Sequence, residues 1–322
     1  FNDTLVAVNQ GGKRKGAGCA YLEVWHPDVE DFLELRKNTG DDRRRCHDMN
    51  TALWICDDFM TAVKEESDWY LFNPSECPDL HETYGKEFTA IYNNYKEEAD
   101  KGLLDYYRVI NAKDLWKKIL TALYETGHPW ITFKDPSNIR YSNKHAGVVH
   151  SSNLCTEILL HTKPNIYEEG VMTQRGETAV CNLASINLSN HLKKRTVDWK
   201  ELAETVEVAV RGLDNVIDLN FYPTEEARDS NIKNRPVGLG IMGTHDMLHV
   251  LGISYDSQDA IKLCGKVQEF ISYHAIKTSC LLAKEKGAYP TFGGSEWDCG
   301  KFPIDTYCDL INLRKGSKKY KA

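Results

Sequence analysis

Predicted strands and helices alternate along the first half of this chain, and this alternation limits the possible folds more than any other feature. Strand patterns cover residues 51–55 and 129–133, and helical patterns cover residues 26–39, 82–101 and 112–126. A short amphipathic segment through Phe59, Met60 and Val63 follows the first strand. Glycine comes directly after two of the helices, which is common at helix ends. Such alternation is typical of α/β folds, and we predict one here.

Two longer helices are predicted in the second half, at residues 199–219 and 256–286, the latter either unbroken or divided in two. Between them, residues 238–243 have the G-x-G-x-x-G spacing of a dinucleotide-binding turn. That turn should follow a hydrophobic strand and open a helix, but the preceding residues 229–235 are almost entirely polar. A dehydrogenase is therefore a weak alternative, which NAD binding would test. No repeat or linker divides the chain, and we treat it as one domain or part of one.

The central stretch Ser151-Ser152-Asn153-Leu154-Cys155-Thr156-Glu157-Ile158 carries the candidate chemistry. If the stretch is extended, the side chains of Asn153, Cys155 and Glu157 project to the same side. One face would then hold an amide, a reactive thiol and a base. Taken by residue type alone, Cys155 is more often a small buried hydrophobe and Glu157 a solvated strand residue.

A basic, glycine-rich loop lies near the start of the chain, in Asn9-Gln10-Gly11-Gly12-Lys13-Arg14-Lys15-Gly16-Ala17-Gly18. Glycine permits positive φ angles and close backbone approach, and the cations favour an anion or a polar base edge. The loop lacks the spacing of a P-loop. From composition alone it is a flexible turn.

The string Asn-Leu-Cys-Thr-Glu-Ile at residues 153–158, preceded by Ser, resembles the active-site loop of the large subunit of class I ribonucleotide reductases. A second match follows in the family's order, in Ala179-Val180-Cys181-Asn182-Leu183-Ala184-Ser185-Ile186-Asn187-Leu188. The resemblance extends from the glycine-rich loop to Phe292. It implies that residues 1–322 are the central part of a ten-stranded α/β barrel, with Cys155 on a loop threaded through it.

The resemblance also implies roles for individual residues. Cys155 would be the thiyl radical site, Glu157 the general base on the 3′-hydroxyl, and Asn153 a hydrogen-bonding partner of the substrate hydroxyls. Cys181 would be one member of the redox pair that supplies two electrons; its alternative is a buried structural cysteine. Residues Gln10, Gly11, Gly12, Lys13 and Arg14 match the substrate-specificity loop, with Arg14 as the base-contacting arginine.

The implied activity is reduction of ribonucleoside diphosphates to deoxyribonucleoside diphosphates, dependent on thioredoxin or glutaredoxin, with ATP and dNTPs as allosteric effectors. Cys-Thr-Glu favours class I over the cobalamin-dependent class. The radical would therefore come from the metal cofactor of a separate small subunit, and we expect no metal bound to this chain. A homo-oligomer is also expected.

Several features of the family are expected to lie outside this sequence. They are the partner of Cys181, the tyrosine pair that relays the radical, the late phosphate-binding loop, the C-terminal cysteines, and the N-terminal activity-control region. We therefore expect the isolated chain to be inactive without the remaining large-subunit segments and the small subunit. The alternative from another class is a non-catalytic module that completes a split reductase complex.

Composition agrees with an intracellular location. The net charge of −7 argues against a general nucleic-acid binder. The ten cysteines contain no C-x-x-C and no ligand-type pairing with histidine, which favours a reducing compartment. No apolar run approaches the length of a membrane span, and no signal sequence opens the chain. A cytoplasmic protein is expected.

Overall fold

The computed structural model describes the backbone of residues 1–316, and the side chains of that part other than those of Asn9, Gln10, Arg14 and residues 314–316. The chain divides into two compact units. The first unit contains residues 1–162 and, after the second unit, residues 295–316; the second contains residues 163–294.

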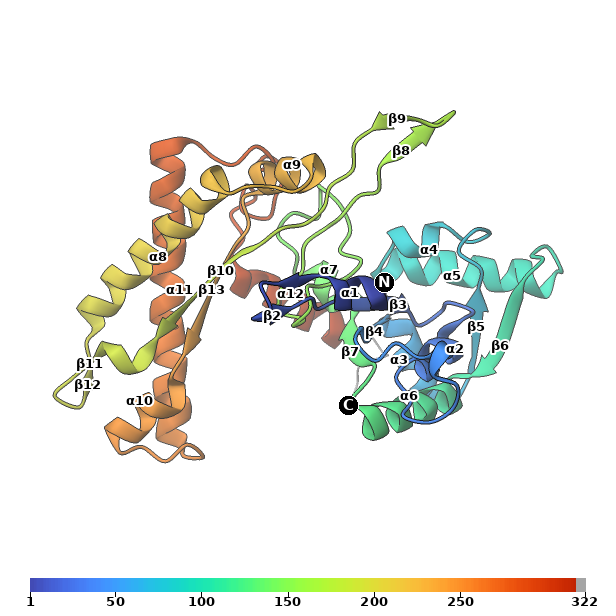
Figure 1. Ribbon diagram of the computed structural model, residues 1–322, viewed down its shortest axis with the longest axis horizontal. Coiled ribbons are helices and arrows are strands. Elements are labelled where there is room, and N and C mark those ends of the chain that lie inside the picture. The colour runs from blue at the N-terminus through green and yellow to red at the C-terminus, as the bar shows by residue number, and fades with distance from the viewer. Residues whose placement is uncertain (317–322) are drawn as a thin grey trace. The chain divides into compact units, whose positions relative to one another are not determined.

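The first unit is built around a parallel sheet in the order β3-β4-β7 (Figure 1). Its strands are β1 (Asn9–Gln10), β2 (Arg14–Lys15), β3 (Cys19–Glu23), β4 (Asn50–Ile55), β5 (Asp68–Phe72), β6 (Tyr107–Asn111) and β7 (Trp130–Phe133). Its helices are α1 (Asn2–Ala7), α2 (Val29–Glu34), the 3-10 helix η1 (Asp42–Arg44), α3 (Asp57–Glu65), α4 (Asp79–Glu82), α5 (Gly85–Asp100), α6 (Ala112–Thr126), α7 (Lys134–Ile139) and α12 (Pro303–Gly316).

Local sequence signals explain why α6 forms where predicted. The side chain of Asn111 accepts hydrogen bonds from the backbone N–H groups of Lys113 and Asp114, which caps the first turn. Gly127 ends the helix with a φ of 72°, a left-handed conformation that glycine adopts without strain. The face that carries Leu115 and Ile119 is buried in the main core, with β4, β5 and α3.

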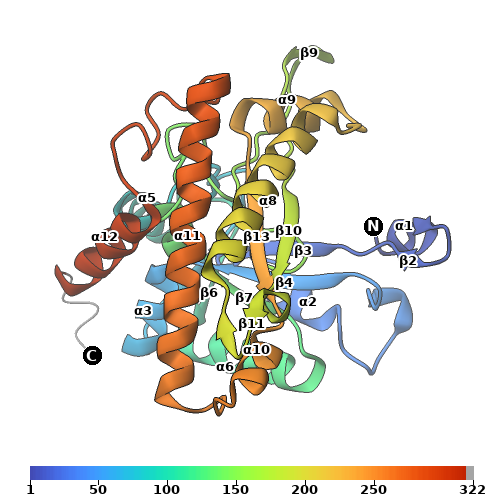
Figure 2. The same cartoon turned by 90° about the vertical axis from the view of Figure 1, so that its left-hand side faces the viewer.

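The second unit pairs β10 with β13 in a parallel two-stranded sheet. Its strands are β8 (Ile166–Glu168), β9 (Val171–Gln174), β10 (Asn182–Asn187), β11 (Leu192–Lys193), β12 (Thr196–Val197) and β13 (Val237–Met242). Its helices are the 3-10 helix η2 (Leu188–His191), α8 (Trp199–Leu219), α9 (Glu225–Asn234), α10 (Thr244–Leu251) and α11 (Gln258–Lys286). Helices α8 and α11 run side by side in both views (Figure 1 and Figure 2), and their apolar faces form the core of this unit.

The α/β prediction is confirmed, and so are the predicted helices over α5, α6, α8 and α11 and the strands β4 and β7. The predicted helix over 26–39 is too long, because α2 ends at Glu34 and η1 follows. Gly238 and Gly240 lie inside β13 and not in a strand-to-helix turn, which removes the basis for a dinucleotide site. Among the described residues no sheet has more than three strands, so no closed barrel forms.

No helix in the described part of the chain combines the length and the apolar character needed to cross a membrane.

Candidate active site

The segment around Cys155 is a tight turn and not an extended strand, so the alternation of side chains considered for an extended stretch does not apply. The backbone N–H of Asn153 donates to the carbonyl of Ile158 at 3.3 Å, and the N–H of Thr156 donates to the carbonyl of Asn153 at 3.3 Å. The turn therefore runs from Asn153 to Ile158, and Cys155 and Glu157 lie inside it. Both of these side chains are exposed.

Thr156 is what makes the turn possible. Its φ is 70°, in the left-handed region, which is a genuine outlier for a β-branched residue. A conformation of this kind costs about 1–2 kcal/mol and persists only where the surrounding contacts enforce it. The strained residue separates Cys155 from Glu157, so it sets the directions in which the thiol and the carboxylate leave the backbone.

The side chain of Asn153 holds the turn closed. Its Oδ1 accepts from the backbone N–H of Ile158 at 3.1 Å and from the hydroxyl of Ser152 at 3.1 Å, and that hydroxyl also contacts the carbonyl of Ile158 at 2.7 Å. Because its acceptor atom is occupied in the loop, Asn153 can offer a substrate only the N–H groups of its Nδ2 atom.

Tyr21 of β3 anchors the turn to the sheet. Its hydroxyl donates to the carbonyl of Asn153 at 3.2 Å. Burial raises the pKa of Tyr21 to about 12, with smaller contributions from the charges of Cys19, Glu157 and Cys155. The phenol therefore stays protonated at neutral pH and remains a donor.

A second clamp fixes the chain just before the turn. The side-chain amide of Asn138, on α7, donates to the carbonyl of Val149 at 3.0 Å and accepts from its N–H at 2.8 Å. Both residues are almost completely buried. These two reciprocal hydrogen bonds resemble those between neighbouring β-strands. They fix the position of the backbone at Val149, just before the turn.

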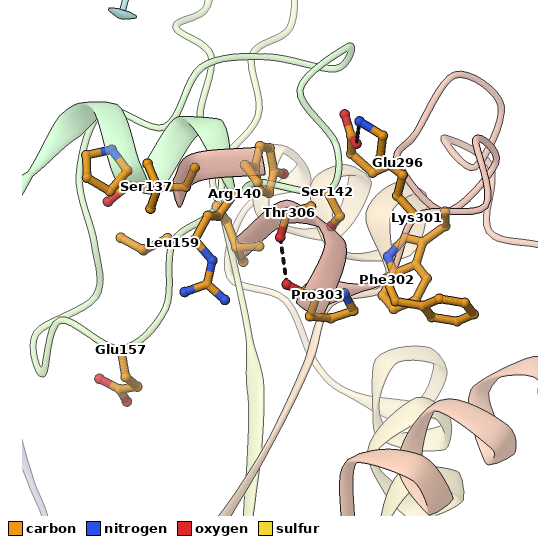
Figure 3. Close-up of a pocket in the computed structure, with 15 residues that line it drawn as sticks. Ser137, Arg140, Ser142, Glu157, Leu159, Glu296, Lys301, Phe302, Pro303 and Thr306 are labelled. Carbon is orange, nitrogen blue, oxygen red and sulfur yellow. Dashed lines mark hydrogen bonds and ion pairs between the residues drawn. The ribbon is translucent and has the colours of Figure 1, made fainter. Parts of the chain in front are cut away.

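A cavity of about 450 Å³ adjoins Glu157 within the first unit. Its apolar lining includes Leu159, Phe302 and Leu310, from the end of the turn and from α12 and the residue before it. The guanidinium group of Arg140 lies over the ring of Tyr307 at 5.5 Å. Figure 3 shows this group pointing toward the side of the cavity where Glu157 lies.

Cys181 belongs to the second unit, directly before β10. It is a partly buried thiol whose Sγ lies 3.7 Å from the carbonyl oxygen of Asn182. The register of β10 against β13 pairs Asn182 with Val237 and so fixes the backbone that follows the thiol.

The glycine-rich loop is a hairpin of β1 and β2, in which Gln10 pairs with Arg14. Gly11 and Gly12 have φ angles of 62° and 72°, and Lys13 is exposed. Turn residues of this kind need glycine. The side chains of Gln10 and Arg14 lie outside the described residues.

Sequence reasoning missed three residues that build this site: Tyr21, Asn138 and Thr156. Tyr21 and Asn138 lie outside the quoted motifs, and the motif that contains Thr156 does not reveal its backbone angle. Each residue acts through a bond or an angle that only the fold creates. The sequence carried no signal for Asn138, because its burial and its short helix appear only in the fold.

Comparison with known proteins agrees with this picture. Residues 1–321 match the family model described as ribonucleotide reductase, barrel domain. The chain is 55% identical over 313 residues to a ribonucleoside-diphosphate reductase subunit alpha of Chlamydia muridarum, covering 97% of this chain and 29% of the relative. It is 45% identical over 349 residues to the subunit of the same name from Helicobacter pylori, covering 94% of this chain and 43% of the relative.

A relative from Caenorhabditis elegans, a ribonucleoside-diphosphate reductase large subunit, is 39% identical over 329 residues, covering 99% of this chain and 40% of the relative. The chain thus spans less than half the length of these three curated relatives. Because the family model covers almost every residue of the sequence, this chain belongs to the ribonucleotide reductase barrel-domain family.

Proposed function

We propose that this chain supplies the thiyl radical site for the reduction of ribonucleoside diphosphates to deoxyribonucleoside diphosphates. The observation that carries the proposal is the turn at residues 153–158, which exposes Cys155 and Glu157 together on a closed, anchored loop. The names of the matched relatives support the choice of substrate class.

In this proposal the sulfur-centred radical of Cys155 takes the 3′-hydrogen of the ribose. Glu157 accepts the proton of the 3′-hydroxyl, for which its exposed carboxylate must come within hydrogen-bond reach of the substrate. The Nδ2 group of Asn153 donates to a substrate hydroxyl. The dithiol supplies the proton with which the 2′-hydroxyl leaves as water and the hydrogen that the 2′ carbon gains. The 3′-hydrogen then returns from Cys155 to the 3′ carbon, and Glu157 gives its proton back to the 3′ oxygen.

The two electrons come from a dithiol that contains Cys181 and a cysteine from another part of the reductase. This dithiol is oxidised to a disulfide, which thioredoxin or glutaredoxin then reduces. The metal cofactor of a small subunit supplies the initial radical. ATP or a dNTP acts through the hairpin at residues 10–14, where Arg14 contacts the base. The complex is a homo-oligomer of the large subunit joined by the small subunit, in the cytoplasm.

The test is CDP reduction, with thioredoxin or dithiothreitol as the reductant. The chain is mixed with a small subunit, with and without the complementary large-subunit segments. Activity that appears only in the complete mixture supports the proposal. No activity in a mixture whose complex is shown to assemble would leave a non-catalytic module as the better account.

A further inference from the structure

Two imidazoles and a carboxylate meet in the first unit, away from the cavity beside Glu157. They belong to His81 and Glu82 of α4 and to His150, five positions before Cys155. One ligand atom from each side chain lies within 4.8 Å of the other two. The Nε2 atom of His150 is 3.3 Å from Oε2 of Glu82, and the two imidazole rings are stacked with centroids 4.0 Å apart.

The three side chains differ in freedom of movement. The side chain of His150 is only 10% exposed, and its Nδ1 atom is buried with no hydrogen-bond partner among the described residues. The side chains of His81 and Glu82 are 46% and 59% exposed. The cluster thus combines one fixed imidazole with two side chains that can move toward a ligand.

Charges of both signs surround the cluster: the carboxylate of Glu82 favours a cation here, while the ammonium group of Lys134 opposes positive charge on His150. Glu23 lies 3.4 Å from Nδ1 of His81, and its charge is balanced by the buried ammonium group of Lys134 at 2.6 Å. The carboxylate of Glu82 is then the negative charge that no cation balances among these four side chains. Its Oε2 atom contacts His150. A negative charge next to imidazole nitrogens attracts a divalent cation.

We propose that His81, Glu82 and His150 form a binding site for a divalent transition-metal ion such as Zn²⁺. Two histidines and one carboxylate are a ligand set that this ion accepts, with bonds of about 2.0–2.2 Å. Imidazole and carboxylate ligands without thiolate also distinguish such a site from the soft sulfur sites that cysteines make. This proposal departs from the expectation that the chain binds no metal. The sequence carries no signal for the site, because His150 lies far from the other two ligands along the chain.

Binding requires a defined movement. In a stack with an interplanar angle of 12°, the two rings are nearly parallel, so one ion cannot lie in the plane of both. His81, which is exposed, must leave the stack and turn its ring toward the ion. The bound ion would then join α4 to the segment that leads into the Cys155 turn, separate from the radical chemistry.

Titration with Co²⁺ under anaerobic, reducing conditions tests the site, because Co²⁺ has visible absorption bands that report its ligands. We expect the chain to bind one more equivalent of Co²⁺ than its His81→Gln and Glu82→Gln variants. The difference spectrum should show visible bands without the near-ultraviolet absorption of thiolate-bound cobalt. Addition of Zn²⁺ should abolish these visible bands, because Zn²⁺ displaces Co²⁺ from the site.

The matched control is His47→Gln, which removes an exposed histidine outside the cluster. This variant should keep the extra equivalent. His81 and Glu82 are exposed, so their variants should fold, which circular dichroism checks; His150→Gln is a further variant for use if it folds. Equal Co²⁺ binding by the chain and by the two exposed variants would overturn the proposal, and so would a difference spectrum dominated by thiolate absorption.

Discussion

The hydroxyl group of Tyr21 donates a hydrogen bond to the main-chain carbonyl of Asn153 at 3.2 Å, across 132 positions of sequence. This bond ties the first strand of the parallel sheet to the turn that carries Cys155. Replacing Tyr21 by Phe removes the bond and keeps the ring against Trp54, whose centroid lies 6.1 Å away. We expect a loss of about 1 kcal/mol in the local stability of the turn, which is roughly a fivefold faster amide exchange at residues 153–158.

Hydrogen exchange followed by mass spectrometry measures this effect. Tyr124→Phe is the control, because that side chain is 93% exposed. Equal exchange in the Tyr21→Phe variant and the unchanged chain would show that the anchor does not hold the turn.

Thr156→Gly tests the strain in the turn. Because glycine adopts a φ of 70° freely, we expect stability to stay level or to rise by up to about 1 kcal/mol. Activity of the assembled reductase should fall, since Cys155 and Glu157 lose their fixed directions. Thermal unfolding and CDP reduction measure the two effects.

Thr39→Gly is the comparison, because Thr39 lies in a loop and does not have a positive φ. That change should lower stability. A Thr156→Gly variant that is both destabilised and fully active would contradict this account of the turn.

Lys134 is a buried cation whose removal should be costly. Its ammonium group is 0% exposed and contacts Glu23 at 2.6 Å and the carbonyls of Leu80 and His81 at 3.0 and 2.9 Å. Lys134→Met leaves the charge of Glu23 buried without its ammonium partner, next to Trp25 and His81, so we expect a loss of about 3–5 kcal/mol in the free energy of unfolding.

The double variant Lys134→Met with Glu23→Gln should recover part of that loss, as measured by urea unfolding. Lys101→Met, which breaks an exposed ion pair with Glu97, should cost about 1 kcal/mol or less. If the double variant is as unstable as the single one, the unpaired charge is not the cause.

Asp135 should make stability depend on pH. Its carboxylate accepts the N–H groups of Asp57 and Gly85, at the first turns of α3 and α5. Burial, followed by the charge of Asp57, raises the pKa of Asp135 from 3.8 to about 6. The folded chain therefore holds this proton more tightly than the unfolded chain does. The contribution to stability is fully present below pH 4 and is lost as the pH rises to about 6, by roughly 3 kcal/mol.

Asp135→Asn removes the titration. The unfolding free energy of the chain minus that of the variant should fall between pH 4 and 6 and stay constant above that range. Asp3→Asn, at an exposed position, should leave the slope unchanged. A difference that does not vary with pH would contradict the raised pKa of Asp135.

The sequence predicts the parts of this fold whose signals are local. Asn111 and Gly127 mark the two ends of α6, and apolar spacing predicts α8 with the bounds that the structure has, Trp199–Leu219. The identities of Asn153, Cys155 and Glu157 as candidates came from a motif. The motif does not predict the conformation of these residues. Thr156 takes its φ of 70° because Tyr21 and the Asn153 side chain hold the turn. The meeting of His81 with His150 is likewise a product of the fold.

The central claim is that Cys155 carries the radical, and its most direct test is CDP reduction by the fully assembled reductase with Cys155→Ser. Cys46→Ser, at a partly exposed cysteine of the same unit, is the matched control. We predict that the control keeps its activity while Cys155→Ser falls to background with its assembly intact. Substantial CDP reduction by the Cys155→Ser enzyme would contradict the account.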